Sequence, residues 1–306
     1  MTSIVDTFDG VRSATEDRGG SVGFVPTMGY LHEGHVSLLE AARRDSEVVV
    51  MSLFVNPLQF NETSDLDAYP RDLDRDVTLA ARAGVDLVFA PTDSEMYPTP
   101  PLTRVNVSGL ADAMEGAHRP GHFEGVATVV AKLFAGVRPD TAYFGRKDAQ
   151  QLAIVRRMAA DLSFPVAVVG CPIIRHQSGL AMSSRNSRLS EGDRQPALAL
   201  SGALMAAADA IDHGERSSGV VERIVTNELE QAKHVAAEYA TVASQATMQP
   251  VEAIDEPAVV AVAAHVGPVR LIDNIHIDFI EGRVVVDRGI RLDRPSVLFD
   301  ETEGGL

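Results

Sequence analysis

The chain has 306 residues, a length typical of about two domains, and its 45% hydrophobic and 23% charged residues provide for ordinary hydrophobic cores. Its 27 basic and 43 acidic residues give a formal net charge of −16, and a surface of that sign repels phosphate backbones. The composition therefore disfavours a general binder of nucleic acid or of anionic membranes. It leaves room for a local basic pocket that binds a small anion.

A single cysteine and short apolar runs exclude further classes of protein. Cys171 rules out a disulfide framework and any multi-cysteine zinc or iron–sulfur site, and its apolar surroundings predict a buried side chain. Residues 1–18 lack the hydrophobic core of a signal peptide, and no apolar run approaches the roughly 20 residues that span a bilayer. We expect a soluble, cytoplasmic protein.

The first half alternates short apolar runs with helical patterns. The sequence predicts strands at 22–25, 48–55, 86–90, 141–144 and 166–169, and helices from about 35 and at 71–83, 124–137 and 148–160. This alternation is typical of right-handed βαβ units around an open parallel sheet. Because such sheets bind ligands beyond the carboxyl ends of their strands, functional residues are expected just after each apolar run.

Beyond about residue 173 the pattern changes to an α+β arrangement. The sequence predicts helices at 196–212 and 220–237 and strands at 259–264 and 274–279. The predicted fold class is thus α/β, with a Rossmann-like open parallel sheet domain over 1–173 and a smaller C-terminal α+β domain over 174–306. Residues from about 287 onward are expected to form a loosely ordered tail.

The tetrapeptide His32-Glu33-Gly34-His35 lies between the first strand and the first helix. Gly34 allows the backbone to approach a ligand, and the helix N-terminus favours an anion. These features suit the phosphates of a nucleoside triphosphate. Taken alone, the motif fits helix-capping or surface histidines equally well, and a zinc site is disfavoured because no third ligand lies nearby.

Other segments are suggestive only in combination. Gly179–Asn186 and Phe144–Asp148 supply hydroxyls and cations for phosphate oxygens. A domain linker is the simpler explanation for the first, and a solvated helix start explains the second equally well. The amides of Gln59 and Gln151 could hold a small polar substrate, and the cation and imidazole of the 119–123 turn could join them, but surface positions are the simpler explanation for each.

Asp72, Asp74 and Asp76 near a helix start could bind Mg²⁺, or form a solvated face matched to the helix dipole. The sequence contains no G-x-x-x-x-G-K-[ST] loop, no G-x-G-x-x-G after a strand and no G-x-S-x-G elbow. A P-loop ATPase, a nicotinamide enzyme and a serine hydrolase of that type are therefore not supported.

Taken in order, several blocks resemble the pantothenate synthetase (pantoate–β-alanine ligase) family of His-x-Gly-His nucleotidyltransferases. These blocks are residues 25–35, 54–60, 65–71, 119–126, 143–151 and 179–186, with 270–275 the clearest later match. The resemblance is strong over about 22–190, weaker to 279, and absent from the tail. Departures from the family pattern occur at Tyr30, where a small residue is usual, at 175–178 and at 244–246.

The resemblance implies a ligase that forms an amide bond in two steps. The carboxylate of pantoate attacks the α-phosphate of ATP, giving an enzyme-bound pantoyl adenylate and pyrophosphate, and the amine of β-alanine then displaces AMP. The family further implies a homodimer, Mg²⁺ with ATP through unspecified ligands, and a C-terminal domain that acts as a lid to shield the adenylate from water.

Carried over by position, the resemblance assigns residues to three groups. Its ATP-binding set is Met28, Gly29, Tyr30, Leu31, His32, Glu33, Gly34, His35, Gly145, Arg146, Lys147, Asp148, Ile174, Met182, Ser183, Ser184 and Arg185. The chemical roles fall on His32, His35, Lys147 and Arg185, with His35 at the position of the family's proton donor. The substrate-binding set for pantoate and β-alanine is Gln59, Gln151, Asn56, Arg119 and His122.

Two alternatives stay open. A nucleotidyltransferase acting on a phosphorylated acceptor would need cationic contacts for that phosphate, whereas paired neutral glutamines suit a hydroxy acid. A non-catalytic nucleotide-binding relative would have lost one of the four residues with chemical roles, and all four are present. The acidity of the chain and the lack of an anticodon-binding region disfavour a class I aminoacyl-tRNA synthetase.

Overall fold

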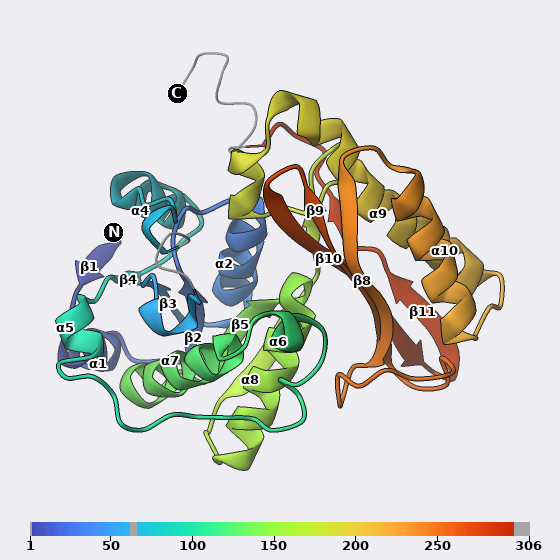
Figure 1. Ribbon diagram of the computed structural model, residues 1–306. Coiled ribbons are helices and arrows are strands. Elements are labelled where there is room, and N and C mark those ends of the chain that lie inside the picture. Colours follow the sequence, from blue (N-terminus) through green and yellow to red (C-terminus); the bar gives the residue numbers. More distant parts are fainter. Residues whose placement is uncertain (1, 62–65, 297–306) are drawn as a thin grey trace. The chain divides into compact units, whose positions relative to one another are not determined.

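The computed structural model describes residues 2–61 and 66–296 (Figure 1). The chain divides into two compact units. Unit 1 comprises Met1–Leu31, His35–Gly145 and Ile154–Cys171, and unit 2 comprises His32–Gly34, Arg146–Ala153 and Pro172–Leu306. In the described part of the chain, no helix has both the length and the apolar character needed to cross a membrane.

Unit 1 contains a parallel sheet, as predicted, and this sheet has six strands. Its strands are β1 (Ser3–Val5), β2 (Val22–Thr27), β3 (Val48–Leu53), β4 (Leu87–Phe89), β5 (Thr141–Gly145) and β6 (Ala167–Cys171). The order across the sheet is β1-β4-β3-β2-β5-β6, and β2 pairs with β3 in register from Val22 opposite Val48 to Thr27 opposite Leu53. The sheet is open at β1 and β6, which is the arrangement expected of βαβ units.

Helices cover both faces of this sheet. The helical elements of the first half are α1 (Phe8–Arg18), α2 (Glu33–Asp45), η1 (Pro57–Gln59), α4 (Leu73–Arg82), α5 (Asp93–Met96), α6 (Met114–His118), α7 (His122–Val137), η2 (Arg146–Asp148) and α8 (Ala149–Asp161). Tyr143 of β5 belongs to the apolar cluster with α2 and α4. Phe144, the residue after Tyr143 in the strand, packs edge-on against Phe134 of α7. Because neighbouring residues of a strand point to opposite faces, the two helix sets lie on opposite sides. Cys171 is buried, as predicted.

The sequence did not predict β1 or α1. The helix is mostly polar and buries only Val11 and Thr15, so its apolar periodicity is weak. It is instead held by its cap, because the Thr7 side chain accepts a hydrogen bond from the Gly10 N–H at 3.1 Å. Strand β1 is three residues long and is stabilised by pairing with β4. No local sequence pattern predicts this pairing.

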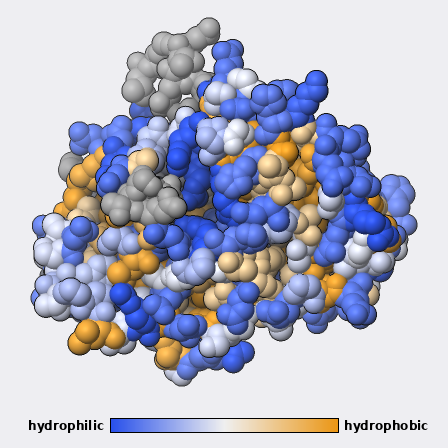
Figure 2. All heavy atoms as spheres, in the orientation of Figure 1, coloured by the Kyte–Doolittle hydropathy of each residue, from blue (hydrophilic) through white to orange (hydrophobic). Residues whose placement is uncertain are grey.

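Unit 2 is built on an antiparallel sheet in the order β11-β10-β9-β8. Its strands are β8 (Val235–Ser244), β9 (Ala258–Val266), β10 (Val269–Ile280) and β11 (Arg283–Asp287); β7 (Ile174–Arg175) and β12 (Ile290–Arg291) form a separate parallel pair. Helices α9 (Glu191–Asp212) and α10 (Ser218–Gln231) share one apolar cluster with the sheet, and η3 (Ser184–Arg188) precedes them (Figure 1). The visible surface of both units is mostly hydrophilic (Figure 2).

Three expectations for the second half need correction. Helix α9 begins at Glu191 rather than Pro196, because the Ser190 side chain caps it by accepting from the Asp193 N–H at 3.2 Å. The helix predicted to reach residue 237 ends at Gln231, and 235–237 already belong to β8, where pairing with β9 overrides helix propensity. The supposed tail contains β12, held by β7, while 297–306 lie outside the described residues.

Candidate active site

The turn that follows β2 is held in an unusual backbone conformation by Asp76. Gly29 and Tyr30 have φ angles of +85° and +51°, in the left-handed region. The buried Asp76 carboxylate accepts hydrogen bonds from the N–H groups of Tyr30 and Leu31, both at 2.7 Å. A Cβ on Gly29 would lie 2.9 Å from Asp76 Oδ2, so this close approach requires glycine.

Asp76 is a residue that sequence reasoning placed wrongly. Asp72 does cap α4, since its Oδ1 accepts from the Arg75 N–H at 3.1 Å, but Asp76 faces inward and is 2% exposed. Burial raises the pKa of Asp76, while the two backbone N–H donors oppose that rise. Asp76 lies four residues before the buried Ala80, a spacing that puts both on one face of the helix, and this spacing is a sequence signal for its inward orientation.

Tyr30, the departure from the family pattern, is accommodated by Arg75. The guanidinium of Arg75 lies 5.1 Å from the centroid of the Tyr30 ring, within the range of a cation–π interaction. Its Nη1 also donates to the Leu31 carbonyl at 3.0 Å. Helix α4 therefore supplies both an anion and a cation that shape the turn ahead of His32.

The histidines of the His-x-Gly-His motif lie at the start of α2. His32 is buried, and its Nδ1 accepts a hydrogen bond from the Gly34 N–H at 3.1 Å. This contact assigns the proton of the neutral ring to Nε2. A Cβ on Gly34 would lie 2.9 Å from His32 Nδ1, which explains the glycine between the two histidines. His35 follows in the first turn of the helix and is half-buried.

In unit 1, Asn56 orients the side chain of Gln59. Asn56 Oδ1 accepts from the Tyr97 hydroxyl at 2.9 Å and from the Leu58 N–H at 3.3 Å. Its Nδ2 donates to Gln59 Oε1 and to the Gly125 carbonyl, both at 3.1 Å, so protein groups fill all of its hydrogen-bonding positions. Burial raises the pKa of Tyr97 to about 12, which keeps its hydroxyl a donor.

The Gln59 amide is thereby fixed with its nitrogen toward Met28. Nε2 of Gln59 lies 3.1 Å from Met28 Sδ, and the side chain is buried. The structure thus brings together Met28, Asn56 and Gln59, which the resemblance assigned to neighbouring ATP and substrate sets.

Arg119 and His122 hold the backbone of Gln59 rather than its side chain. His122 Nδ1 donates to the Gln59 carbonyl at 2.8 Å, because a carbonyl oxygen can only accept. Nε2 of the neutral ring then accepts from Arg119 Nη1 at 3.1 Å. Arg119 Nη2 also reaches the Gln59 carbonyl, at 3.4 Å.

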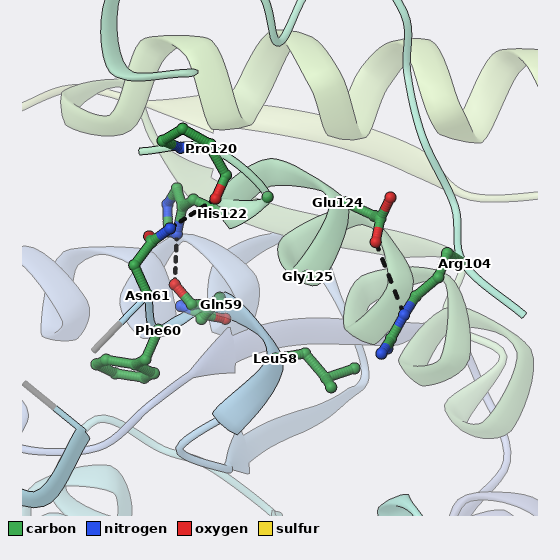
Figure 3. Close-up of a pocket in the computed structure, with 10 residues that line it drawn as sticks. Leu58, Gln59, Phe60, Asn61, Arg104, Pro120, His122, Glu124 and Gly125 are labelled. Carbon is green, nitrogen blue, oxygen red and sulfur yellow. Dashed lines mark hydrogen bonds and ion pairs between the residues drawn. The ribbon is translucent and has the colours of Figure 1, made fainter. Parts of the chain in front are cut away.

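A pocket of about 160 Å³ opens beside Gln59 (Figure 3). Its lining residues are Leu58, Gln59, Phe60, Asn61, Arg104, Pro120, Gly121, His122, Glu124 and Gly125. Arg104 Nε and Glu124 Oε1 are 3.7 Å apart, so the pocket presents a cation and an anion side by side. Sequence reasoning did not single out this pair, since Arg104 lies outside every recognised block and Glu124, within the 119–126 block, was given no role.

In unit 2, strand β10 holds the main chain of the Arg146–Asp148 segment. Asn274 Nδ2 donates to the carbonyls of Arg146 and Lys147, at 3.2 and 2.6 Å. His276 Nε2 donates to the Arg146 carbonyl at 3.1 Å, and burial lowers the pKa of His276, so the ring is neutral. Lys147 and Asp148 therefore follow a backbone fixed by residues more than 120 positions later.

The Arg146 side chain is committed to two carboxylates. Its Nη1 donates to Asp278 Oδ2 at 3.0 Å and to Asp287 Oδ2 at 3.1 Å. Although burial opposes it, the hydrogen bonds from Arg146 and Gln245 lower the pKa of Asp278. In this conformation Arg146 anchors the segment, and Lys147 is the neighbouring cation with no such ion pair among the residues described.

Arg175 anchors the segment that leads to Ser183–Arg185. Its guanidinium is 3% exposed and forms a two-point ion pair with Asp273, at 2.6 and 3.1 Å. The remaining N–H groups donate to the carbonyls of Gly179, Asn274 and Arg288, so every donor of this side chain is used. Sequence analysis identified 175–178 only as a departure from the family pattern, and no neighbouring residues in the sequence predict that Arg175 anchors this segment.

Beyond Arg175 the chain turns back and enters η3. The Met182 N–H donates to the Ile174 carbonyl at 2.9 Å, which places these two expected nucleotide contacts side by side. The Ser183 side chain caps η3 by accepting from the Arg185 N–H at 3.3 Å, and Ser184 and Arg185 are half-buried. Gly145 ends β5, and Gln151 lies in the first turn of α8.

The carboxylates considered for Mg²⁺ do not form a metal cage. Asp72 and Asp76 accept backbone N–H groups, as described above, while Asp74 is exposed. Across residues 2–61 and 66–296, no three His, Cys, Asp or Glu side chains are grouped so that they could hold a metal ion.

Comparisons with known proteins identify the family of the chain. Residues 3–276 match the family model for pantoate-beta-alanine ligase. A pantothenate synthetase of Heliobacterium modesticaldum is 52% identical over 260 residues, which are 85% of this chain and 92% of that protein. Another, from Pelobacter propionicus, is 51% identical over 85% of this chain and 91% of its own length.

Solved structures extend the likeness to the fold. The crystal structure of pantothenate synthetase from Thermus thermophilus has a TM-score of 0.85 and 48% identity, covering 90% of this chain and 98% of its own. That of pantoate-beta-alanine ligase from Francisella tularensis, complexed with beta-gamma ATP and beta-alanine, has a TM-score of 0.72 and 31% identity, covering 90% and 97%. The chain belongs to the pantoate–β-alanine ligase family.

Proposed function

We propose that this chain is a ligase that condenses pantoate with β-alanine, using ATP and releasing AMP and pyrophosphate. The observation that carries the proposal is the family match over residues 3–276, a span in which His32, His35, Lys147 and Arg185 are all present. The Francisella tularensis relative, whose structure holds an ATP-type ligand and beta-alanine, supports the choice of these substrates.

In the first step, a pantoate carboxylate oxygen forms a bond to the α-phosphorus of ATP, and the bond to the pyrophosphate oxygen breaks. Negative charge grows on the α-phosphate oxygens, so preorganised donors lower the barrier. His32 donates through Nε2, the protonated nitrogen assigned above, and His35, Lys147 and Arg185 supply further positive or donor groups. In this proposal their work is charge stabilisation.

In the second step, the amine of β-alanine attacks the acyl carbon of the adenylate, loses a proton, and the AMP oxygen leaves. The pocket beside Gln59 suits a small zwitterion, because Arg104 can pair with its carboxylate and Glu124 with its ammonium group. In this proposal the Gln59 amide, which Asn56 holds, binds pantoate, and Gln151 is the second amide that the family resemblance assigns to this substrate.

The proposal extends to Mg²⁺, oligomeric state and location. Mg²⁺ enters with ATP, bound chiefly by phosphate oxygens and water, which agrees with the lack of a protein cage in the described residues. We further propose a homodimer working in the cytoplasm, as the family resemblance implies. Sedimentation of the full chain tests the dimer, and a requirement for Mg²⁺ in the assay below tests the metal.

The test is pyrophosphate release from ATP and Mg²⁺, with and without each substrate. We expect release that depends on pantoate and reaches steady turnover only when β-alanine is added. Pyrophosphate release that does not depend on pantoate but requires a phosphorylated acceptor would show that the chain is a nucleotidyltransferase instead. ATP binding without any pyrophosphate release would indicate that the chain is a non-catalytic nucleotide-binding relative.

A further inference from the structure

The C-terminal segment of unit 2 continues past the last residue of the family match. The match ends at residue 276, whereas β11, β12 and Ser296 follow it and are part of the ordered fold. We call residues 283–296 the strap. The contacts that the strap makes with other segments, described below, all lie within unit 2, and together they reach three segments assigned to nucleotide binding.

The first contact fixes the backbone around Ile174. The Ile290 N–H donates to the Ile173 carbonyl at 2.7 Å, and the Leu292 N–H donates to the Arg175 carbonyl at 2.8 Å. These bonds pair β12 with β7 in parallel, Ile290 opposite Ile174. The strap thereby adds a strand beside a predicted contact of the nucleotide.

Gly289 makes this pairing possible. Its φ is +78°, and a Cβ there would lie 2.6 Å from the Ile173 carbonyl oxygen, a backbone atom that cannot turn aside. One residue earlier, the Arg288 carbonyl accepts from Arg175 Nε at 2.6 Å. The strap is therefore fitted to this segment by a close approach and by the buried guanidinium together.

The second and third contacts reach the other two nucleotide segments. Asp287 Oδ2 accepts from Arg146 Nη1 at 3.1 Å, while its Oδ1 accepts from the Gly289 N–H at 2.9 Å. Ser296 is 2% exposed, and its hydroxyl donates to Glu33 Oε2 at 3.2 Å, within the His-x-Gly-His motif. The strap thus touches 32–34, 146–148 and 173–175, which are distant from one another in sequence.

We propose that the strap is a positioning element for the nucleoside triphosphate, holding these three segments in the geometry that binds ATP. This inference rests on the proposed nucleotide site. It assigns a function to residues beyond the family match, and it predicts that losing the strap weakens ATP binding while pantoate binding, centred on Gln59 in unit 1, is little changed.

The test compares two shortened chains. One ends at Asp287, which removes β12 and Ser296 but keeps β11 and the carboxylate bound to Arg146; the other ends at Ser296 and is the control. We expect the first to bind a non-hydrolysable ATP analogue about tenfold or more weakly by calorimetry, with the KM for pantoate within about twofold of the full chain. The control should match the full chain in both.

A matched pair of point variants guards against loss of folding. Gly289→Ala and Gly282→Ala both place a side chain at positive φ, but only Gly289 has a backbone oxygen in the way, since nothing lies within 4 Å of a Cβ at Gly282. We expect a higher KM for ATP in Gly289→Ala alone. Both should keep the circular dichroism spectrum of the full chain.

Two failures are distinguishable. If the full chain binds the ATP analogue but shows no pantoate-dependent release, the proposed function fails, and the calorimetric comparison still decides the strap. If release is normal and both the chain ending at Asp287 and Gly289→Ala bind the analogue as tightly as the full chain, the strap has no positioning role. Equal losses for ATP and pantoate would also overturn it, because they indicate general destabilisation.

Discussion

The two units hold the side chains and segments assigned to the candidate site by different means. In unit 1 the residues around Gln59 lie within a few positions of strand ends, and their partners, Asn56 and His122, belong to recognisable blocks. In unit 2, the Arg146–Asp148 and Ile174–Arg185 segments are held by Asp273, Asn274 and the strap, more than 90 positions later. In unit 1 the loops that follow the parallel strands meet at one edge of the sheet. In unit 2 the side chains of β10 instead bond to segments that are distant in sequence.

The largest expected effect comes from Arg175. Arg175→Ala leaves the Asp273 carboxylate buried without its two-point partner, and loss of one member of a buried pair costs about 3–5 kcal/mol of unfolding free energy. Urea unfolding measures it. The exposed helix pair of Arg157 with Asp161 gives the control, because Arg157→Ala should change stability little. Similar, small losses in both variants would refute the anchoring role of Arg175.

Asp76 tests the same idea in unit 1, with a smaller effect. In Asp76→Asn the amide oxygen still accepts one of the N–H groups of Tyr30 and Leu31, but the NH₂ group faces the other as a second donor. The lost hydrogen bond costs about 1–3 kcal/mol of unfolding free energy. The kcat/KM for ATP should fall as well, since the turn carries Met28–Leu31. Asp74→Asn, on the exposed side of the same helix, is the control. A variant at Asp76 that behaves like this control would exclude the role.

Asn274 separates positioning from stability in unit 2. Asn274→Ala leaves the Lys147 carbonyl without its side-chain donor and the Arg146 carbonyl with the donor of His276, and we expect the KM for ATP to rise about tenfold with kcat less affected. Steady-state kinetics measures the split. Asn227, exposed on α10, provides the matched Asn→Ala control. An unchanged KM for ATP at Asn274 would show that β10 does not position Lys147.

The smallest effect is a pH dependence from Asp278. The pKa of this carboxyl lies below its usual value of 3.8 in the folded chain, so its ionised form stabilises the fold above about pH 4. That contribution is lost as the pH falls through the folded-state pKa. The difference in unfolding free energy between the wild type and Asp278→Asn, measured by urea unfolding, should therefore be smaller at pH 3 than at pH 7. A gap that stays constant with pH would contradict the ion pair with Arg146.

Sequence patterns predicted strands β2 to β6 of unit 1 because buried parallel strands are continuous apolar runs, as at Val48–Leu53. They missed β1 and α1, which depend on one cap and one strand pairing, and they extended a helix into β8, where pairing with β9 decides the conformation. Local periodicity carries no information on such long-range pairing.

The candidate site was predictable to a similar degree. Motif residues such as His32 and Gln59 are visible because their neighbours in sequence are also part of the site. Asp76, Arg175 and Asn274 are not, because each acts through contacts with backbone groups far along the chain. The roles of the motif residues themselves remain predictions.

The most direct test of the central claim follows one oxygen atom. If the carboxylate of pantoate attacks the α-phosphate of ATP, pantoate labelled with ¹⁸O in its carboxylate transfers one labelled oxygen to AMP when the amide forms. Mass spectrometry of the AMP after complete turnover with β-alanine reads this out. Singly labelled AMP is the predicted result. Unlabelled AMP, or labelled inorganic phosphate with ADP, would contradict an adenylate and with it the proposed function.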